Sequence, residues 1–149
     1  NLVNNYTISS LHSLFSKASV INRKLEKVKS MEVSKILKLK ANGLHSCPNE
    51  LSGGNQQKVL LGRWMLDHYK VLILEEPTRG VDVGAKAEIY HQINRMAEQG
   101  LAVIMYSTEM MELLGMADRI LVFSAGKLTA SLDKSEATQE KIMEHALVR

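Results

Sequence analysis

The chain has 149 residues, 45% hydrophobic and 23% charged, which is typical of a globular chain with one core. The formal charge of +3 is small and the basic residues form no dense run, so no nucleic-acid partner is expected. A single cysteine, Cys47, excludes an internal disulfide, and no apolar run is long enough to span a membrane. We therefore expect a cytoplasmic chain. Because it begins with Asn1 and not Met, we also expect its beginning to have been removed.

The first third of the sequence indicates helices. Between residues 21 and 39, apolar residues that include Val28 and Ile36 recur every three or four positions, which predicts one or two amphipathic helices. We expect the lysines between them to form a solvated face, with a membrane-lipid patch as the alternative: Lys24, Lys27, Lys29, Lys35, Lys38 and Lys40. Residues 41–50 carry glycine, proline and asparagine and predict a loop.

Residues 51–62 read LSGGNQQKVLLG, with two adjacent glycines before a helical pattern. Adjacent glycines cost backbone entropy, so we expect something to approach the backbone closely there. Ser52 is a suitable N-cap for a helix over residues 55–66 that ends near Asp67 and His68. We expect one side of this helix to carry Val59, Leu60 and Trp64.

A strand, a helix and a second strand follow. VLIL at residues 71–74 stops at two acids and a proline, the pattern of a parallel strand buried on both faces. Residues 85–99 predict a helix with apolar positions at Ile89, Ile93, Met96 and Ala97. LAVIMYS then predicts a second buried strand, so the segment should form a parallel βαβ unit.

The C-terminal third predicts a short helix, a hairpin and a last helix. The short helix covers residues 109–114, and RILVF pairs with KLTASL across residues 124–126. Thr138 can cap an amphipathic helix that ends near Val148.

Two groups of residues have the chemistry of a phosphate and magnesium site. Glu75 and Glu76 lie at the tip of a buried strand, where two carboxylates are costly unless they share a cation or a proton. Mg²⁺ together with phosphate is the usual cation of such a site. Residues 52–55 start a helix, where free amides and the helix dipole favour an anion.

These motifs resemble those of the ABC-type ATPases. LSGGNQQK resembles their signature loop, and VLILEEPTRGVD resembles their magnesium-binding strand, catalytic glutamate and D-loop. EPTRGVDVGAK and STEMMELLGMADRI are similar to the second nucleotide-binding domain of carbohydrate importers of the ribose, galactose, xylose and autoinducer-2 type. The resemblance implies an α/β fold: a partial helical subdomain over residues 1–50, then a signature helix, a parallel sheet core and a C-terminal hairpin and helix over residues 51–149.

The resemblance also assigns roles to residues. The nucleotide-binding set comprises Leu51, Ser52, Gly53, Gly54, Asn55 and Gln56, which would close over ATP held by a partner domain. The D-loop comprises Gly80, Val81 and Asp82, although Asp82 alone is also typical of a turn or cap. Glu76 is the implied catalytic residue, Glu75 the implied Mg²⁺ ligand and Glu109 the switch position.

Three departures from the family pattern lead to a hypothesis of unequal sites. Glu75 stands where the family has aspartate, and Glu109 stands at the switch histidine, where a carboxylate would repel the γ-phosphate. None of the nine glycines belongs to a GxxxxGK[ST] phosphate loop, so the chain as written should not build its own ATP site. We expect the site completed by this chain's signature loop to hydrolyse ATP, and the site framed by its three glutamates to turn over poorly.

The resemblance implies an ATP-binding part of a sugar importer, sharing ATP and Mg²⁺ with another nucleotide-binding domain. Its further partners would be transmembrane permease subunits and, indirectly, a periplasmic sugar-binding protein, which places it peripherally on the cytoplasmic face of the inner membrane. The alternative is a truncated, non-catalytic remnant that at most docks on a partner. An ABC-type ATPase of translation or DNA repair is disfavoured by RGVDVGAK and the lack of basic runs.

Overall fold

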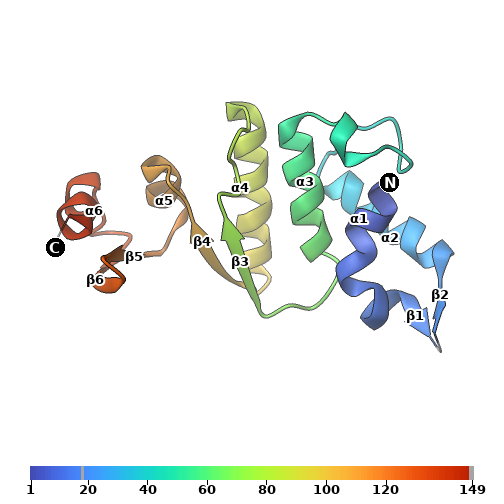
Figure 1. Cartoon of the computed structure of the whole chain (residues 1–149), viewed down its shortest axis with the longest axis horizontal. Helices are drawn as coiled ribbons and strands as arrows, with labels where there is room; N and C mark the ends of the chain where they lie inside the picture. Colours follow the sequence, from blue (N-terminus) through green and yellow to red (C-terminus); the bar gives the residue numbers. More distant parts are fainter. Residues whose placement is uncertain (18, 148–149) are drawn as a thin grey trace. The chain divides into compact units, whose positions relative to one another are not determined.

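The computed structural model describes residues 1–17 and 19–147 and divides the chain into two compact units (Figure 1). Unit 1 comprises Asn1–Ile73 and Pro77–Ile104, and unit 2 comprises Leu74–Glu76 and Met105–Arg149. The expected boundary at residue 50, between a helical subdomain and an ATPase core, is not tested by these units and stays a prediction. Among the described residues, none of the helices combines the length and apolar character needed to cross a bilayer.

Unit 1 begins with short helical segments and a small hairpin. In chain order these are α1 (Leu2–Thr7), η1 (Ile8–Ser10), η2 (Leu11–Phe15), β1 (Ser16–Lys17), β2 (Val20–Ile21) and α2 (Arg23–Ile36). The side chain of Asn1 caps α1 by accepting from the Asn4 amide, and Asn22 caps α2 by accepting from the Leu25 amide. The strands β1 and β2 pair antiparallel and lead directly into α2.

Helix α2 confirms the predicted amphipathic helix but buries a more polar face than expected. Its buried residues are Glu26, Ser30 and Val33. The Glu26 carboxylate accepts from Thr7 Oγ1 at 2.8 Å and from Arg23 at 2.9 Å, which compensates its burial. The apolar periodicity includes Val28 and Ile36, yet both are exposed.

Helix α3 (Gly53–Trp64) follows η3 (Pro48–Glu50). It ends at Trp64, before the predicted Asp67 and His68. Of the residues expected on one side of this helix, Val59 is buried whereas Leu60 is exposed. The reason is steric. A Cβ added at Gly62 would lie 2.5 Å from Tyr6 and 2.7 Å from Leu37, so α3 packs closest through its glycine face.

The strands β3 (Val71–Glu75) and β4 (Ala102–Tyr106) pair with each other, and α4 (Val83–Glu98) connects them (Figure 1). Hydrogen bonds from Ala102 to Lys70 and from Glu76 to Tyr106 join matching ends of the strands, as a parallel pair requires.

The predictions that β3 is buried on both faces and that β4 is a buried strand are wrong. In β3, Leu72 is buried but Ile73 is 72% exposed, and in β4 Ile104 is exposed as well. The described residues give this sheet two strands, and nothing among them covers the side on which Ile73 lies. Burial of a parallel strand on both faces needs layers on both sides of the sheet.

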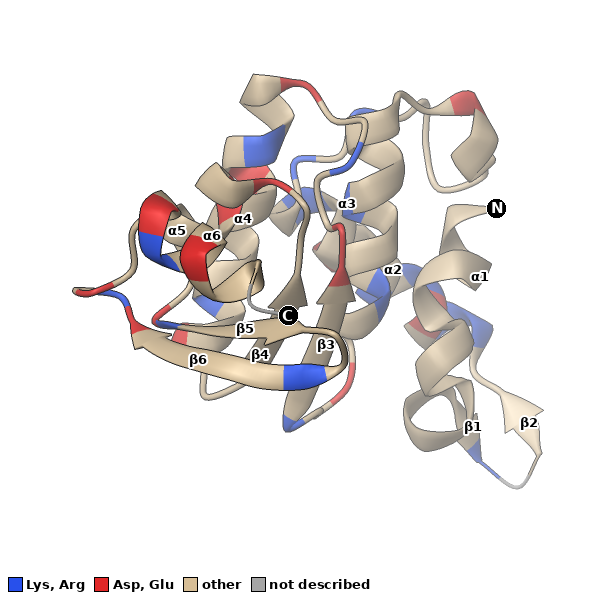
Figure 2. Ribbon diagram, turned by 60° about the vertical axis from the view of Figure 1, so that its left-hand side comes forward, with Lys and Arg blue, Asp and Glu red and all other residues tan. Residues whose placement is uncertain are grey.

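Unit 2 contains the predicted hairpin and helices (Figure 2). Its elements are α5 (Met110–Met116), β5 (Arg119–Ser124), β6 (Lys127–Asp133) and α6 (Gln139–Ala146). The strands pair antiparallel, with a register shift between Val122 and Phe123. Thr138 caps α6 as expected by accepting from the Lys141 amide, whereas the expected helix end at Val148 lies outside the described residues. The core of this unit is formed by Ile120, Val122, Leu132 and Ile142.

Candidate functional site

The predicted nucleotide-binding segment, residues 51–56, forms the entrance and first turn of α3 in unit 1. Asn55 holds Ser52 in place: its Nδ2 donates to Ser52 Oγ at 2.9 Å, while its Oδ1 accepts from the Lys40 amide at 3.0 Å. The bond from the Lys40 amide fixes which end of the Asn55 amide faces Ser52. Ser52 Oγ therefore accepts a hydrogen bond from Asn55 through one of its lone pairs. The hydroxyl hydrogen of Ser52 remains able to donate to a ligand.

The start of α3 also presents backbone donors. The first bond of the helix runs from the Gln56 amide to the Ser52 carbonyl, and the Gln56 side chain donates to the Leu51 carbonyl at 2.9 Å. Among residues 1–17 and 19–147, the amides of Gly53, Gly54 and Asn55 find no acceptor. Three free donors at the positive end of a twelve-residue helix favour an anion.

The two adjacent glycines pack against the turn that precedes α4. A Cβ added at Gly54 would lie 2.7 Å from the Cβ of Ala85, and one added at Gly53 would lie 3.0 Å from the Gly80 carbonyl oxygen. The distance of 2.7 Å at Gly54 is shorter than a real Cβ atom keeps from other heavy atoms, so a side chain does not fit there. The expected close approach is thus made by this chain itself, and the approach of a phosphate to the glycines stays a prediction.

That turn contains the predicted D-loop residues. The Val81 amide donates to the Thr78 carbonyl at 3.2 Å, and Gly80 has a φ of +71°, which favours glycine. Val81 is buried. Asp82 Oδ1 accepts from the Ala85 amide at 3.0 Å, so the side chain caps α4. A contact of Asp82 across a dimer stays a prediction.

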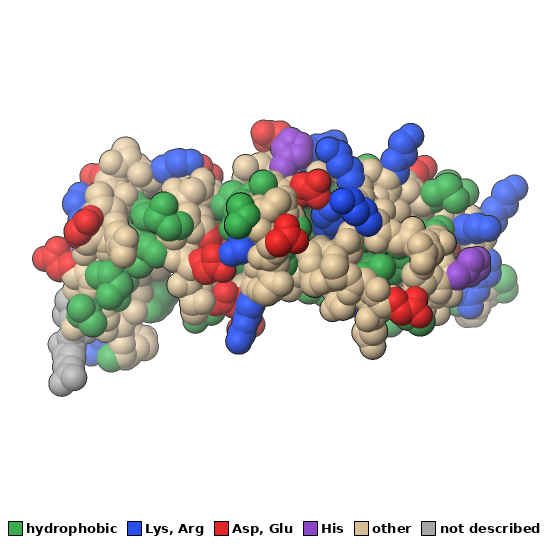
Figure 3. All heavy atoms as spheres, turned by 90° about the horizontal axis from the view of Figure 1, so that it is seen from above, with side chains coloured by type: hydrophobic (Ala, Val, Ile, Leu, Met, Phe, Trp, Pro, Cys, Tyr) green, Lys and Arg blue, Asp and Glu red, His purple; other side chains and the backbone are tan. Residues whose placement is uncertain are grey.

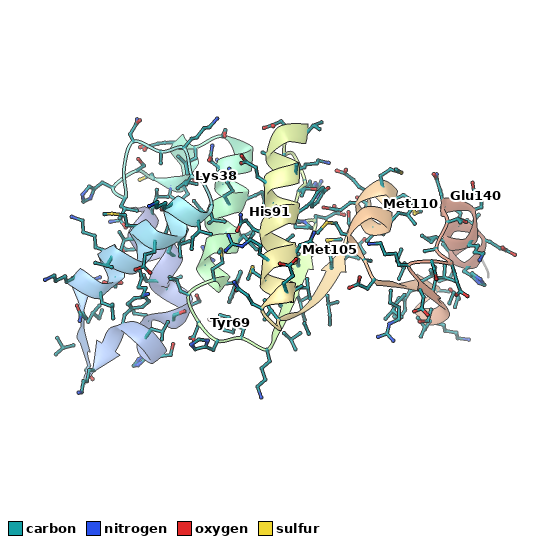
Figure 4. The ribbon with its side chains drawn as sticks, turned by 180° about the vertical axis from the view of Figure 1, so that it is seen from behind. Lys38, Tyr69, His91, Met105, Met110 and Glu140 are labelled. Carbon is teal, nitrogen blue, oxygen red and sulfur yellow. The ribbon has the colours of Figure 1, made fainter. Side chains whose placement is uncertain are left out.

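Sequence reasoning missed an ion pair between α3 and α4, which lie side by side (Figures 1 and 4). The side chain of Lys58 is only 6% exposed, and its ammonium contacts the carboxylate of Glu88, whose side chain is about half exposed. The hydrogen bond from Lys58 lowers the pKa of Glu88. The available signal was spacing, since Lys58 follows the buried Gly54 by one helical turn.

The predicted acidic residues gather in unit 2, at the ends of β3 and β4. The Glu76 amide donates to the Tyr106 carbonyl at 2.8 Å, and Glu76 Oε1 accepts from the Thr108 amide at 2.8 Å. Glu76 has a φ of +46°, a rare backbone conformation for a glutamate. Glu109 stands at the N-cap position of α5, with its amide donating to Ser107 Oγ at 3.0 Å. The structure therefore brings Glu76 and the segment that carries the switch position together.

These acids can supply only part of the ligand shell of a Mg²⁺ ion. No group of three or more His, Cys, Asp or Glu suited to a metal ion occurs within the described residues. Mg²⁺, however, commonly takes one or two protein carboxylates and completes its shell with phosphate oxygens and water. Glu75 is exposed and its carboxylate has no partner in the described part of the chain, so it fits one such position. One oxygen of Glu76 is already bound by Thr108.

A pocket of about 360 Å³ lies elsewhere in unit 1. It is lined by Asn1, Val3, Asn4, Arg23, Glu26, Lys27, Leu44 and His45. None of the predicted site residues contributes to it, so it is separate from both groups described above.

A family model and curated relatives both match this chain to ATP-binding proteins of ABC transporters. Residues 2–79 match the family model described as ABC transporter. The chain is 49% identical to the xylose import ATP-binding protein XylG of Geobacillus kaustophilus, over 96% of this chain and 28% of that protein. It is 50% identical to the ribose import ATP-binding protein RbsA of Bacillus cereus, over 93% of this chain and 28% of that protein. The chain thus spans about 28% of the length of these relatives.

Solved structures share the fold. A dimeric bacterial ABC transporter cassette has a TM-score of 0.75 at 18% identity and covers 90% of this chain, which in turn covers 56% of the cassette. A nucleotide-free ATP-binding cassette from an ABC transporter has a TM-score of 0.77 at 19% identity, with 99% of this chain and 63% of the cassette covered. At these identities the likeness concerns the fold alone.

Proposed function

Because this chain belongs to the ABC transporter family, we propose that it is part of the ATP-binding subunit of an importer for a sugar or sugar-like solute. Relatives named for the import of xylose and of ribose support the sugar assignment. The observation that carries the proposal is the start of α3, where an oriented serine hydroxyl and three free amides meet. This arrangement suits the γ-phosphate of a nucleotide held by another domain.

In the proposed composite site, the α3 start stabilises negative charge on the γ-phosphate. The amides of Gly53, Gly54 and Asn55 point from the positive end of the helix and donate to phosphate oxygens. The Ser52 hydroxyl, whose oxygen is held by the Asn55 side-chain amide, adds a further donor. Such preorganised donors need little rearrangement when charge develops during phosphoryl transfer.

The glutamates of unit 2 would serve the second composite site. Glu76 keeps one carboxylate oxygen on the Thr108 amide, which leaves the other to accept a proton from water. Glu75 would hold Mg²⁺, which when bound would neutralise charge on phosphate oxygens. Glu109 brings negative charge to the position at which the switch histidine of the family donates a hydrogen bond to the γ-phosphate. We therefore propose slow turnover of ATP at this site.

The partners follow from the same proposal. The chain would work with another nucleotide-binding domain and with transmembrane permease subunits on the cytoplasmic face of the inner membrane, and indirectly with a periplasmic sugar-binding protein. Residues 1–50, as a partial helical subdomain, would transmit closure of the two domains to the permease. Residues 51–149 would supply the signature helix and the ATPase core.

The test measures ATP hydrolysis by a partner nucleotide-binding domain that carries an intact phosphate loop, with and without this chain. We expect the chain to raise the rate, and Ser52→Arg to abolish that rise because the long cation replaces the oriented hydroxyl. Ser135→Arg is the matched control, since Ser135 is exposed in unit 2 and lies outside the proposed site.

Two outcomes would contradict the proposal. A chain that never raises hydrolysis would support the alternative of a non-catalytic docking protein. A rise that survives Ser52→Arg would show that the α3 start does not contact the nucleotide.

A further inference from the structure

The side of α2 that faces solvent is both basic and apolar. At 3.6 residues per turn, Lys24, Lys27, Val28, Met31 and Lys35 fall within roughly 100° of one another around the helix. We call these five residues the α2 outer face. The buried residues Glu26, Ser30 and Val33 lie on the opposite side. Val28 is 47% and Met31 55% exposed, whereas Val33 on the buried side of α2 is 3% exposed.

The α2 outer face carries three positive charges that form no ion pair with any acid in the described part of the chain. Within the described residues, Lys24, Lys27 and Lys35 have no acidic partner. The two acids of α2 are engaged elsewhere: Glu26 is buried with Arg23, and Glu32 pairs with Lys29 at 2.8 Å. Figure 2 marks the positions of lysine and arginine residues in blue along the ribbon of α2, and Figure 3 shows lysine and arginine side chains projecting from one face of the molecule.

We propose that the α2 outer face binds an anionic phospholipid surface. Its lysines would contact headgroup phosphates, while Val28 and Met31 would enter the boundary between headgroups and acyl chains. This inference goes beyond the proposed function and does not depend on it, because no nucleotide takes part.

Two features favour a lipid surface over an acidic protein partner. All three free cations are lysines, whose long stems and compact charge adapt to mobile headgroups, whereas fixed protein carboxylates are matched better by the planar fork of arginine. The apolar residues project from a convex helix and line no part of the pocket described above, so they suit a planar surface into which they can insert.

The test is co-sedimentation of the full 149-residue chain with vesicles. One set contains phosphatidylcholine alone and the other roughly one third phosphatidylglycerol, each at about 0.05 M and about 0.5 M salt. We expect binding to the anionic vesicles at low salt and its loss at high salt. The triple variant Lys24→Gln, Lys27→Gln, Lys35→Gln should bind about a hundredfold more weakly, or about fivefold for each lysine.

A matched control removes the same charge elsewhere. Lys70, Lys127 and Lys134 are exposed and lie outside α2, so their triple change to glutamine should weaken binding less than about fivefold. Met31→Ser, which keeps the charge, should weaken binding about threefold. Circular dichroism verifies that each variant is folded.

The proposal is overturned if the wild-type chain does not sediment with anionic vesicles at low salt, or if it binds neutral vesicles equally well. Equal weakening by the two triple variants would also overturn it, because net charge alone would then explain the binding.

Discussion

Gly54 lies where α3 comes closest to the start of α4. The residue is buried, and the position of its missing side chain is filled by Ala85 and Val81. A glycine next to the proposed phosphate site therefore has a role that is independent of the nucleotide: it sets how closely the signature segment and the D-loop turn approach. The two loops are thereby held together within unit 1.

This packing role predicts a specific stability pattern. Gly54→Ala should lower the free energy of unfolding by about 1–3 kcal/mol, because the new methyl group would lie 2.7 Å from the Cβ of Ala85. Adding Ala85→Gly should restore most of the loss, since it removes the opposing methyl group. Urea unfolding of the two variants measures the difference.

Gly115 provides the control for helix propensity. It lies in α5, and a Cβ there would meet nothing within 4 Å. Gly115→Ala should therefore be neutral or stabilising by up to about 1 kcal/mol. If Gly54→Ala behaves like Gly115→Ala, the glycine is not needed for packing.

At the scale of the elements, α3 and α4 are joined by the Lys58–Glu88 pair as well as by the glycine contact. Lys58 is buried, so its ammonium depends on Glu88 for compensation of the lost hydration. Glu88 is half exposed, which limits what the pair contributes.

We expect Glu88→Gln to lower the free energy of unfolding at pH 7 by about 1–2 kcal/mol. Lys58 lowers the pKa of Glu88 from its ordinary 4.5, so the contribution is fully present above that value. It is lost as the pH falls through the lowered pKa. The difference between wild type and variant should therefore close as the pH falls from 4.5 through the lowered pKa, which urea unfolding across pH measures.

Lys58→Met removes the positive charge, so that the contributions of the two charged groups can be measured separately. Combined with Glu88→Gln it should recover part of the stability, because no uncompensated ammonium is then buried. A gap between wild type and Glu88→Gln that persists in acid would show that the ionised carboxylate is not its source.

Periodicity and capping residues predicted the existence and type of the longer elements, because α2, α4 and the hairpin carry strong local patterns. The exposure of Leu60 and Ile73 could not be predicted in this way. Whether an apolar residue is covered depends on neighbouring layers, which local periodicity does not describe. The Lys58–Glu88 pair was missed for a related reason: the spacing places Lys58 on the same side of α3 as Gly54, but it does not indicate which element packs against that side.

At the scale of the whole molecule, the candidate site residues divide between the two units. Residues 52–55 and the D-loop turn belong to unit 1, whereas Glu76 and Glu109 belong to unit 2. The motifs identified both groups from the sequence, because each is short and contiguous. Their division between units could not be predicted, since it depends on contacts between distant segments such as Glu76 and Thr108.

The separate core of unit 2 predicts that the units can lose structure one at a time. Ile142 is buried against Ile120, Val122 and Leu132, so Ile142→Ala should cost about 2–4 kcal/mol there. In hydrogen exchange measured by mass spectrometry, we expect faster exchange in β5, β6 and α6 and unchanged protection in α3 and α4. Ile93→Ala, in the buried face of α4, should give the reverse pattern. If both variants instead raise exchange along the whole chain, the two units unfold as one cooperative structure, and a change at the signature segment would then reach Glu76 and Glu109 through global stability.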